Sequence, residues 1–298
     1  MARTRTGSFP IGFRRGWSPW QRDLAALIDF AKSNDFAFLD FGPAPVDDLK
    51  QVQAAGVRIG SIDLKDWKDL ASPDPGRRRA AAQANAEYVQ AVTAAVGVRA
   101  FLAVVIPEDT ARPRAENFGF AVDAYGQLMQ AIAPTGARVV LEGWPGQAPH
   151  YASLACTPAD CRALFAAVGS DALGVNFDPS HLIRMGIDPA RFLAEFAPRV
   201  FHAHGKDTAL LPDGRYNHGH TQQATFEKPH EFGGHAWRYT LPGHGNADWP
   251  RLLSILAETG YAARGGLLSI EMEDERFNGD EEGERRGLVE ARDFLAGA

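Results

Sequence analysis

The sequence predicts an α/β protein, a (β/α)8 barrel with a long insert between its seventh and eighth strands. Eight short apolar segments, bounded by Gly, Pro and Asp, have the composition of buried strands. Segments with helical periodicity separate them. The 298 residues fit one large α/β domain or two smaller ones. A doubly wound open sheet is the alternative, but no glycine-rich phosphate-binding motif follows any strand, so the barrel is favoured.

The eight predicted strands are regularly placed along the chain. They lie at about residues 9–14, 36–41, 57–64, 99–106, 138–144, 173–178, 199–204 and 266–272. Each is a short run rich in β-branched or aromatic residues, which suits a strand buried on both faces. A parallel sheet closed by eight such strands is therefore expected.

Helical segments alternate with these strands. The first begins at Ser18-Pro19, an N-cap followed by an N1 proline, and places four apolar residues on one face, Leu24, Leu27, Ile28 and Ala31. Thr157-Pro158 repeats this start signal. The other predicted helices span residues 46–55, 77–96, 115–133, 189–196, 249–259 and 281–295, with glycine stops at Gly56, Gly97, Gly136 and Gly260.

One connection is much longer than the others. Residues 208–242 show neither helical nor strand periodicity and are rich in His, Gly, Asn and Gln. Long irregular loops are usually functional lids or disordered segments, so we expect a lid-like insert within a single domain of residues 1–298. Its histidines, His218, His220, His230 and His235, are irregularly spaced, which favours a lid or a subunit contact over a second metal site.

Composition excludes several classes of partner. The formal net charge of −6 disfavours nucleic acid and anionic membranes as partners and leaves small neutral or hydroxylated substrates.

Cys156 and Cys161 are five residues apart, which suits reduced structural thiols. No apolar signal region or membrane-length apolar run occurs, so a cytoplasmic protein is expected. A homo-oligomer is compatible with the sequence.

Polar residues follow four successive predicted strands. Glu142 ends the fifth strand, Asp178 the sixth, His204 the seventh and Glu271 the eighth. The carboxyl ends of barrel strands form the active-site face. Three carboxylates and one imidazole converging from separate strands can hold a divalent cation. We therefore predict that Glu142, Asp178, His204 and Glu271 are metal ligands.

Each of these residues also has a simpler explanation. A carboxylate after a strand is often a helix N-cap, and a histidine in an apolar strand is often a hydrogen-bonded core residue. Their joint occurrence at consecutive strand ends favours the metal site. His202 shares a face with His204, and is either the alternative ligand or a hydrogen-bonded neighbour one layer below. The oxygen-rich ligand set favours Mn²⁺, Mg²⁺ or Co²⁺ over a structural zinc.

Four segments resemble a known family: VVLEGW, NFDPSHLIRMGIDP, RVFHAHGKDT and YTLPGHGNADWPRLLSILAETGYAARGGLLSIEMED, which cover most of residues 138–275. The chain resembles the xylose isomerase-like TIM-barrel superfamily, in particular its sugar phosphate isomerase/epimerase members, which include ketose 3-epimerases, inosose dehydratases and hydroxypyruvate isomerases. The resemblance implies a divalent cofactor on the same four residues, Mn²⁺ first, with Mg²⁺, Co²⁺ and Zn²⁺ as alternatives. It also implies that His181 and Arg238 bind substrate.

The predicted function is a metal-dependent sugar isomerase or epimerase that removes a proton next to a carbonyl through a metal-stabilised enediolate. Glu142 and Glu271 are the predicted catalytic bases. Lys206 either stabilises an anion or forms a salt bridge with Asp207 or Glu273. Trp144, two residues after a predicted ligand, is a candidate wall for stacking against the sugar.

Three other functions remain open. A metal-dependent lyase or dehydratase would use the same proton abstraction on a keto-sugar, a keto-inositol or a 3-keto-glycoside. A phosphodiesterase resembling endonuclease IV would need further ligands where the sequence has Phe41, Asp63 and Pro107, and a basic surface that this acidic chain does not indicate. A catalytically inactive barrel that only binds a ligand would not need Glu142 and Glu271.

Overall fold

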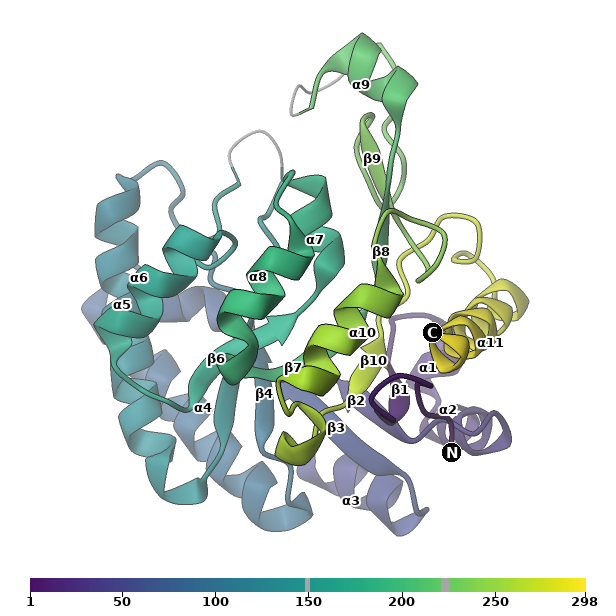
Figure 1. Cartoon of the computed structure of the whole chain (residues 1–298). Coiled ribbons are helices and arrows are strands. Elements are labelled where there is room, and N and C mark those ends of the chain that lie inside the picture. The colour runs from purple at the N-terminus through teal and green to yellow at the C-terminus, as the bar shows by residue number, and fades with distance from the viewer. Residues whose placement is uncertain (148–150, 221–225) are drawn as a thin grey trace.

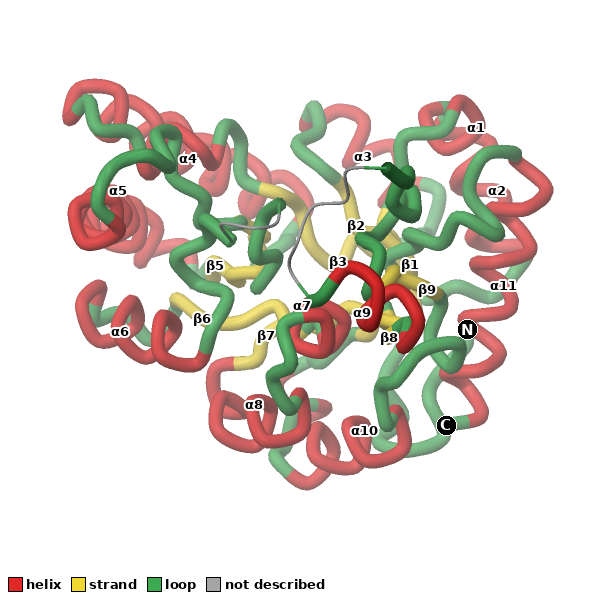
Figure 2. The backbone as a smooth tube through the Cα atoms, turned by 90° about the horizontal axis from the view of Figure 1, so that it is seen from above, coloured by secondary structure: helices red, strands yellow, loops and turns green. Residues whose placement is uncertain are grey.

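Eight parallel strands close into a barrel, as the sequence predicts (Figures 1 and 2). The computed structural model describes residues 1–147, 151–220 and 226–298. The strands follow the order β1-β10-β7-β6-β5-β4-β3-β2 around the barrel. Their bounds are β1 (Ile11–Arg14), β2 (Phe38–Phe41), β3 (Arg58–Asp63), β4 (Ala100–Ala103), β5 (Arg138–Glu142), β6 (Leu173–Phe177), β7 (Val200–Gly205) and β10 (Leu268–Ile270). Each coincides with one predicted strand.

The helices surround the strands (Figure 2). They are α1 (Pro19–Arg22), α2 (Leu24–Ser33), α3 (Val46–Ala54), α4 (Pro75–Val96), α5 (Arg114–Ile132), α6 (Pro158–Val168), α7 (Pro179–Arg184), α8 (Pro189–Phe196), α9 (Pro212–His218), α10 (Trp249–Glu258) and α11 (Glu281–Gly297). The Thr157 hydroxyl accepts a hydrogen bond from the Asp160 amide and caps α6, as predicted.

The prediction of one continuous first helix is wrong. The helix is broken after Arg22, and Asp23 caps the second part, α2, by accepting from the amides of Ala25 and Ala26. The Ser18 hydroxyl does not cap α1, because it donates to Glu284 of α11, 2.6 Å away. A tertiary hydrogen bond has therefore replaced the local cap.

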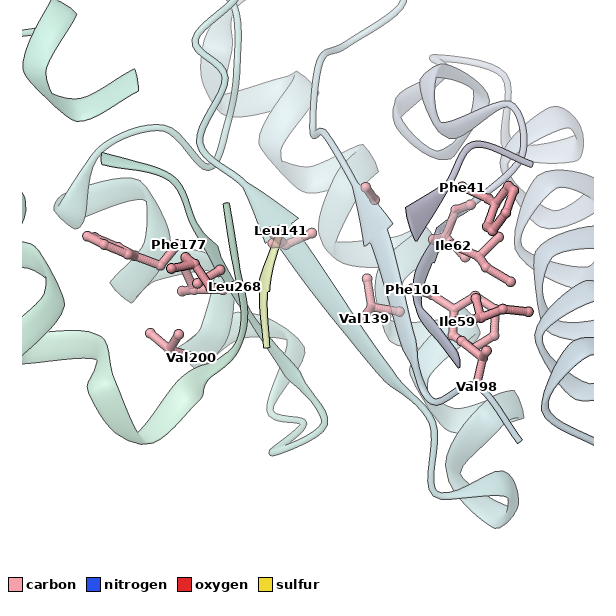
Figure 3. Close-up of a cluster of buried hydrophobic side chains, with 14 of the residues drawn as sticks. Phe41, Ile59, Ile62, Val98, Phe101, Val139, Leu141, Phe177, Val200 and Leu268 are labelled. Carbon is pink, nitrogen blue, oxygen red and sulfur yellow. The ribbon is translucent and has the colours of Figure 1, made fainter. Parts of the chain in front are cut away.

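The barrel separates an apolar outer layer from a polar interior. Val139 and Leu141 of β5 belong to the hydrophobic layer between the strands and the helices (Figure 3). Because side chains alternate along a strand, Glu142 faces the interior. By the same alternation His202 and His204 of β7 share the inner face. The polar residues that the sequence placed in buried strands thus lie inside the barrel, where other polar groups can meet them.

The barrel interior is too tightly packed at Gly174 of β6 to accept a side chain. A Cβ atom there would lie 2.3 Å from the Arg199 carbonyl oxygen and 2.4 Å from the Phe201 ring. We expect Gly174→Ala to lower the free energy of unfolding by about 1–3 kcal/mol in urea denaturation, because backbone has to move. Gly126→Ala is the matched control: the added methyl meets nothing within 4 Å in α5 and should stabilise slightly. Equal urea midpoints for Gly174→Ala and the unmodified chain would contradict this expectation.

The expectation of an irregular 208–242 insert is wrong for much of its length. β8 (Asp207–Leu210) pairs antiparallel with β9 (Trp237–Thr240), and α9 follows β8. This hairpin extends beyond the carboxyl ends of the barrel strands (Figure 1). Strands of four residues with mixed polarity give no clear periodicity, and antiparallel pairing between distant segments is a tertiary property. The prediction also omits the helix α7, because its six residues are too few to show helical periodicity.

The Asp207 carboxylate fixes the base of the hairpin. It accepts hydrogen bonds from the amides of Gly243 and Ala247 and from the Trp249 indole. It is fully buried, and burial raises its pKa while these hydrogen bonds oppose the rise. Asp207 therefore orders the backbone on both sides of the insert.

The helices of the described residues include none with the length and apolar character of a membrane span.

Candidate active site

The four predicted ligands converge at the carboxyl end of the barrel. Glu142 ends β5, Asp178 precedes α7, His204 lies on β7 and Glu271 follows β10. The His204 Nδ1 atom lies 3.5 Å from Glu142 Oε1, 3.5 Å from Glu271 Oε2 and 3.9 Å from Asp178 Oδ2. All four side chains are buried or nearly so. Four strands thus deliver one nitrogen and three oxygens to one point.

Asp178 combines the capping role and the cluster role that the sequence left as alternatives. Its Oδ1 atom accepts from the Ser180 amide at 2.9 Å and from the Ser180 hydroxyl at 2.6 Å, which caps α7. Its Oδ2 atom is buried without a hydrogen-bond partner and lies on the side of His204. Because the cap holds one oxygen, the other is aimed into the cluster.

The cluster fits a divalent cation. Both ring nitrogens of His204 and Asp178 Oδ2 are buried and lack hydrogen-bond partners among the described residues, although such atoms are costly to leave unpaired. Donors bound to one ion at about 2.1 Å lie roughly 3 to 3.5 Å apart, close to the spacing seen here. Small side-chain shifts would bring Glu142, Asp178, His204 and Glu271 onto a common ion.

His181 is also within ligand distance, but its nitrogens are already occupied. Nε2 lies 2.9 Å from Glu142 Oε1, and Nδ1 lies 2.6 Å from the Tyr239 hydroxyl. Glu142, Asp178, His181 and Glu271 offer donor atoms within 4.8 Å of one another. We assign the ligand role to His204, because its nitrogens are unpartnered, and keep His181 as a neighbour that orients Glu142.

The local charges of the carboxylates favour a positive charge at the centre of the cluster, which the His204 imidazolium or a bound cation can supply. Burial raises the pKa of Glu142, but the hydrogen bond with His181 and the charges of His181 and His204 hold that pKa well below its ordinary value. For Glu271 burial is outweighed mainly by the Lys206 charge, and its pKa is also lowered. Burial lowers the pKa of His204, but the Glu271 charge and the contacts with Glu142 raise it to about 10.

Lys206 supplies the main positive charge beside the cluster. Its Nζ atom contacts Glu271, lies 3.1 Å from Glu273 and lies 3.4 Å from Asp178 Oδ2. It is only 2% exposed, and its pKa is raised well above the ordinary value because these carboxylates outweigh the effect of burial. Of the two predicted partners, Lys206 pairs with Glu273, while Asp207 is bound to backbone amides and Trp249.

The insert contributes a residue that the sequence did not single out. Tyr239 of β9 lies against His181, and its hydroxyl also accepts a hydrogen bond from Arg184 of α7 at 2.7 Å. The Arg184 guanidinium stacks 4.0 Å above the Trp237 ring. The pairing of β8 with β9 decides which side chains of the Trp237-Arg238-Tyr239 stretch face the site.

One predicted substrate residue, Arg238, points away from this convergence. Arg238 alternates with Tyr239 on β9 and donates to Glu275 Oε1 at 2.9 Å, so it faces the other side of the hairpin. Trp144 is partly buried in the segment that follows β5.

His202 lies below the cluster rather than in it. Its Nε2 atom is 2.7 Å from Asp40 Oδ2, and its ring centroid is 5.7 Å from that of His204. Of the two sequence interpretations, this arrangement matches a hydrogen-bonded neighbour one layer down. Asp40, at the inner face of β2, also accepts from the Ser61 amide. Its pKa is lowered, because the His202 charge and hydrogen bond outweigh its burial.

A second group lies in the insert. His218, Glu227 and His235 place donor atoms within 4.8 Å of one another, and His218 Nε2 lies 3.2 Å from Glu227 Oε2. His220 and His230 lie outside this group, and His230 pairs with Glu275 at 2.7 Å. Glu227 is well exposed, so this group is less constrained than the barrel cluster.

Fold and site together define a barrel protein with a buried metal-type cluster at the carboxyl ends of its strands. The profile of the family described as xylose isomerase-like TIM barrel matches residues 25–297. The chain belongs to this family, in agreement with the resemblance noted from its motifs.

Individual relatives are similar over shorter stretches or at low identity. YfiH of Bacillus subtilis is 31% identical over 157 residues, which cover 52% of this chain and 46% of that protein. Inosose dehydratase of Clostridium botulinum is 26% identical, with 54% and 48% covered. The chain spans about half the length of these curated relatives. D-psicose 3-epimerase of Clostridium cellulolyticum superposes with a TM-score of 0.67 at 14% identity, covering 96% of this chain and 98% of that structure.

Proposed function

We propose that this protein is a metal-dependent sugar isomerase or epimerase that removes a proton next to a carbonyl. The observation that carries the proposal is the meeting of Glu142, Asp178, His204 and Glu271, with unpartnered donor atoms on Asp178 and His204. A divalent ion held by these four residues, Mn²⁺ first among the candidates, would supply Lewis-acid stabilisation of an enediolate oxygen. Mg²⁺, Co²⁺ and Zn²⁺ are the alternatives.

Glu142 and Glu271 are the proposed bases. Their strands, β5 and β10, are separated in the barrel by β6 and β7, so the two carboxylates approach the centre from different sides. The lowered pKa values of both groups keep them ionised and able to accept a proton. One base is enough for isomerisation between adjacent carbons, whereas epimerisation needs a proton acceptor and a donor on opposite faces of the substrate.

Lys206 and His181 complete the proposed chemistry. The Lys206 ammonium, next to Glu271, would offset negative charge that develops on a substrate oxygen. His181, held between Glu142 and Tyr239, would donate or accept a hydrogen bond at a substrate hydroxyl. Trp144 remains a proposed wall of the sugar site. Arg238 stays a proposal that would require Glu275 to release it.

A lyase or dehydratase on a keto-sugar, keto-inositol or 3-keto-glycoside is the second candidate. The His181–Tyr239–Arg184 chain favours it, because elimination needs an acid that protonates the leaving hydroxyl group. Arg184 next to the Tyr239 hydroxyl would support such a proton donor. The similarity to an inosose dehydratase also supports this candidate.

The two candidates are separated by following hydrogen and mass. The protein is incubated in D₂O with ketoses, keto-inositols and 3-keto-glycosides, with and without Mn²⁺. Metal-dependent deuterium uptake next to the carbonyl, in a product that has lost no water or other leaving group, supports the isomerase or epimerase. A product lighter by one water supports the dehydratase. Absence of exchange with every carbonyl substrate and every metal would reject both.

Tyr239 distinguishes the candidates further. We expect Tyr239→Phe to lower kcat about tenfold to a hundredfold for elimination, because His181 and Arg184 lose their shared hydroxyl. Deuterium exchange next to the carbonyl should change far less, because the Glu142 and Glu271 bases remain. Tyr216→Phe, at an exposed tyrosine of the insert, is the control. Equal losses in exchange and in elimination would contradict a specific role in protonation.

The proposed setting is a cytoplasmic enzyme acting on a small carbohydrate, without a nucleic-acid or membrane partner. A homo-oligomer would fit the exposed apolar residues of the insert, Leu210, Tyr216 and Phe226. Light scattering of the purified protein measures the oligomeric state directly.

A further inference from the structure

A cavity of about 650 Å³ opens at the amino-terminal end of the barrel, the end opposite the candidate active site and the lower end in Figure 1. It is lined by the first residues of β3, β4 and β5 and by the segment before β10. His202 and Phe201 of β7 also line it. The volume lies within the range of about 300–1,000 Å³ that small-molecule sites occupy.

The lining is strongly basic. Four arginines contribute to it, Arg58, Arg99, Arg138 and Arg264, and no aspartate or glutamate does. In a chain with 37 acidic and 31 basic residues, a cavity of one sign is a local departure from the overall balance. Four arginines on one lining give the cavity a positive potential, which favours an anion as its ligand.

These arginines are not used in ion pairs. Among the described residues, the side chains of Arg58, Arg99 and Arg138 form no hydrogen bond and no salt bridge. Arg138 stacks its guanidinium 4.1 Å from the Phe201 ring, which orients it without consuming its N–H donors. By contrast Arg77, on the exposed surface, pairs with both Asp69 and Glu108.

Arg264 is fixed at the cavity by two backbone carbonyl groups. Its Nη1 and Nη2 atoms donate to the carbonyl oxygens of Thr259 and Ala197 at 2.7 and 2.8 Å. Its Nε atom is buried and has no hydrogen-bond partner among the described residues. Arg264 donates to carbonyl groups at the carboxyl ends of α8 and α10, where a positive charge is favourable. The other three arginines make no such hydrogen bond among the described residues.

We propose that this cavity binds a small anion that carries at least two negative charges on phosphate groups. Arginine forks donate paired hydrogen bonds to phosphate oxygens, and the contact of Arg138 with the Phe201 ring uses none of the N–H donors of Arg138. The site is distinct from the proposed metal centre and does not depend on the proposed reaction. His202 forms part of both surroundings, because it lines the cavity and its ring neighbours that of His204.

Pyrophosphate binding to the metal-free full chain tests the proposal, measured by isothermal titration calorimetry at low ionic strength. Two variants test the cavity. One is the double variant Arg58→Gln with Arg99→Gln, whose original side chains are exposed, and the other is Arg138→Gln. Arg191→Gln removes one charge outside the cavity, as Arg138→Gln does inside it, and Lys206→Gln removes the cation at the candidate active site. Far-ultraviolet circular dichroism checks that each variant is folded.

We expect saturable binding that weakens at least tenfold in the double variant and in Arg138→Gln, and that weakens with added salt. Arg191→Gln and Lys206→Gln should bind pyrophosphate like the unmodified chain. No binding at low salt would overturn the proposal, and so would equal affinities in all arginine variants. Loss of binding in Lys206→Gln alone would place the anion at the candidate active site and would also overturn it.

Discussion

Replacing either proposed base should abolish turnover without unfolding the barrel. We expect Glu142→Gln and Glu271→Gln each to lower kcat by at least about a hundredfold to ten-thousandfold, the contribution of a positioned general base. Each substitution keeps the size of the side chain but removes the negative charge that faces His204 at 3.5 Å. Turnover and carbonyl-adjacent deuterium exchange should therefore fall together.

Two comparisons make this result specific. Glu290→Gln removes an equally charged group that pairs with His244 on the outside of the molecule, and should leave kcat unchanged. Circular dichroism and urea midpoints should show that both active-site variants are folded, since the apolar layer around the barrel is untouched. Unchanged turnover in either Glu142→Gln or Glu271→Gln would reject the proposed mechanism.

Removing divalent metal should have an effect of similar size. We expect dialysis against a chelator to lower turnover by on the order of a thousandfold, and added Mn²⁺ to restore it. The physical reason is the crowding of three carboxylates within 3.9 Å of one imidazole, which a divalent charge would offset. Elemental analysis should find about one ion per chain, and His204→Gln should lose it.

His218→Gln is the matched control for metal content. His218 belongs to the histidine group of the insert, so its substitution leaves the barrel cluster intact. The metal content should remain about one ion per chain if the insert group is not a metal site. Full turnover at a metal content far below one ion per chain would refute metal dependence, whatever the behaviour of the histidine variants.

Most of the fold was predictable because its signals are local. Each barrel strand is a short apolar run, and the helix after Thr157 begins at a cap and a proline that act on adjacent backbone. The prediction was wrong where distant residues decide the outcome. Ser18 bonds Glu284 instead of capping α1, and β8 finds its partner β9 almost thirty residues further along the chain.

The candidate site divides in the same way. The barrel rule places the ends of parallel strands on one face, so Glu142, Asp178, His204 and Glu271 could be grouped from sequence alone. Tyr239 could not be, because its position depends on the antiparallel register of the hairpin. That register also turns Arg238 toward Glu275, although Arg238 is adjacent in sequence to Tyr239.

The sequence by itself determined the alternation of strands and helices, and which carboxylates and imidazole follow or face inward from the strands. Strand signals and the alternation of side chains along a strand are local properties. Only the tertiary structure decided which donor atoms remain unpartnered, and that Lys206 pairs with Glu271 and Glu273. It alone brought four arginines to the opposite end. Charges and hydrogen bonds act through space between residues far apart in the chain, so their balance is set by the packed barrel.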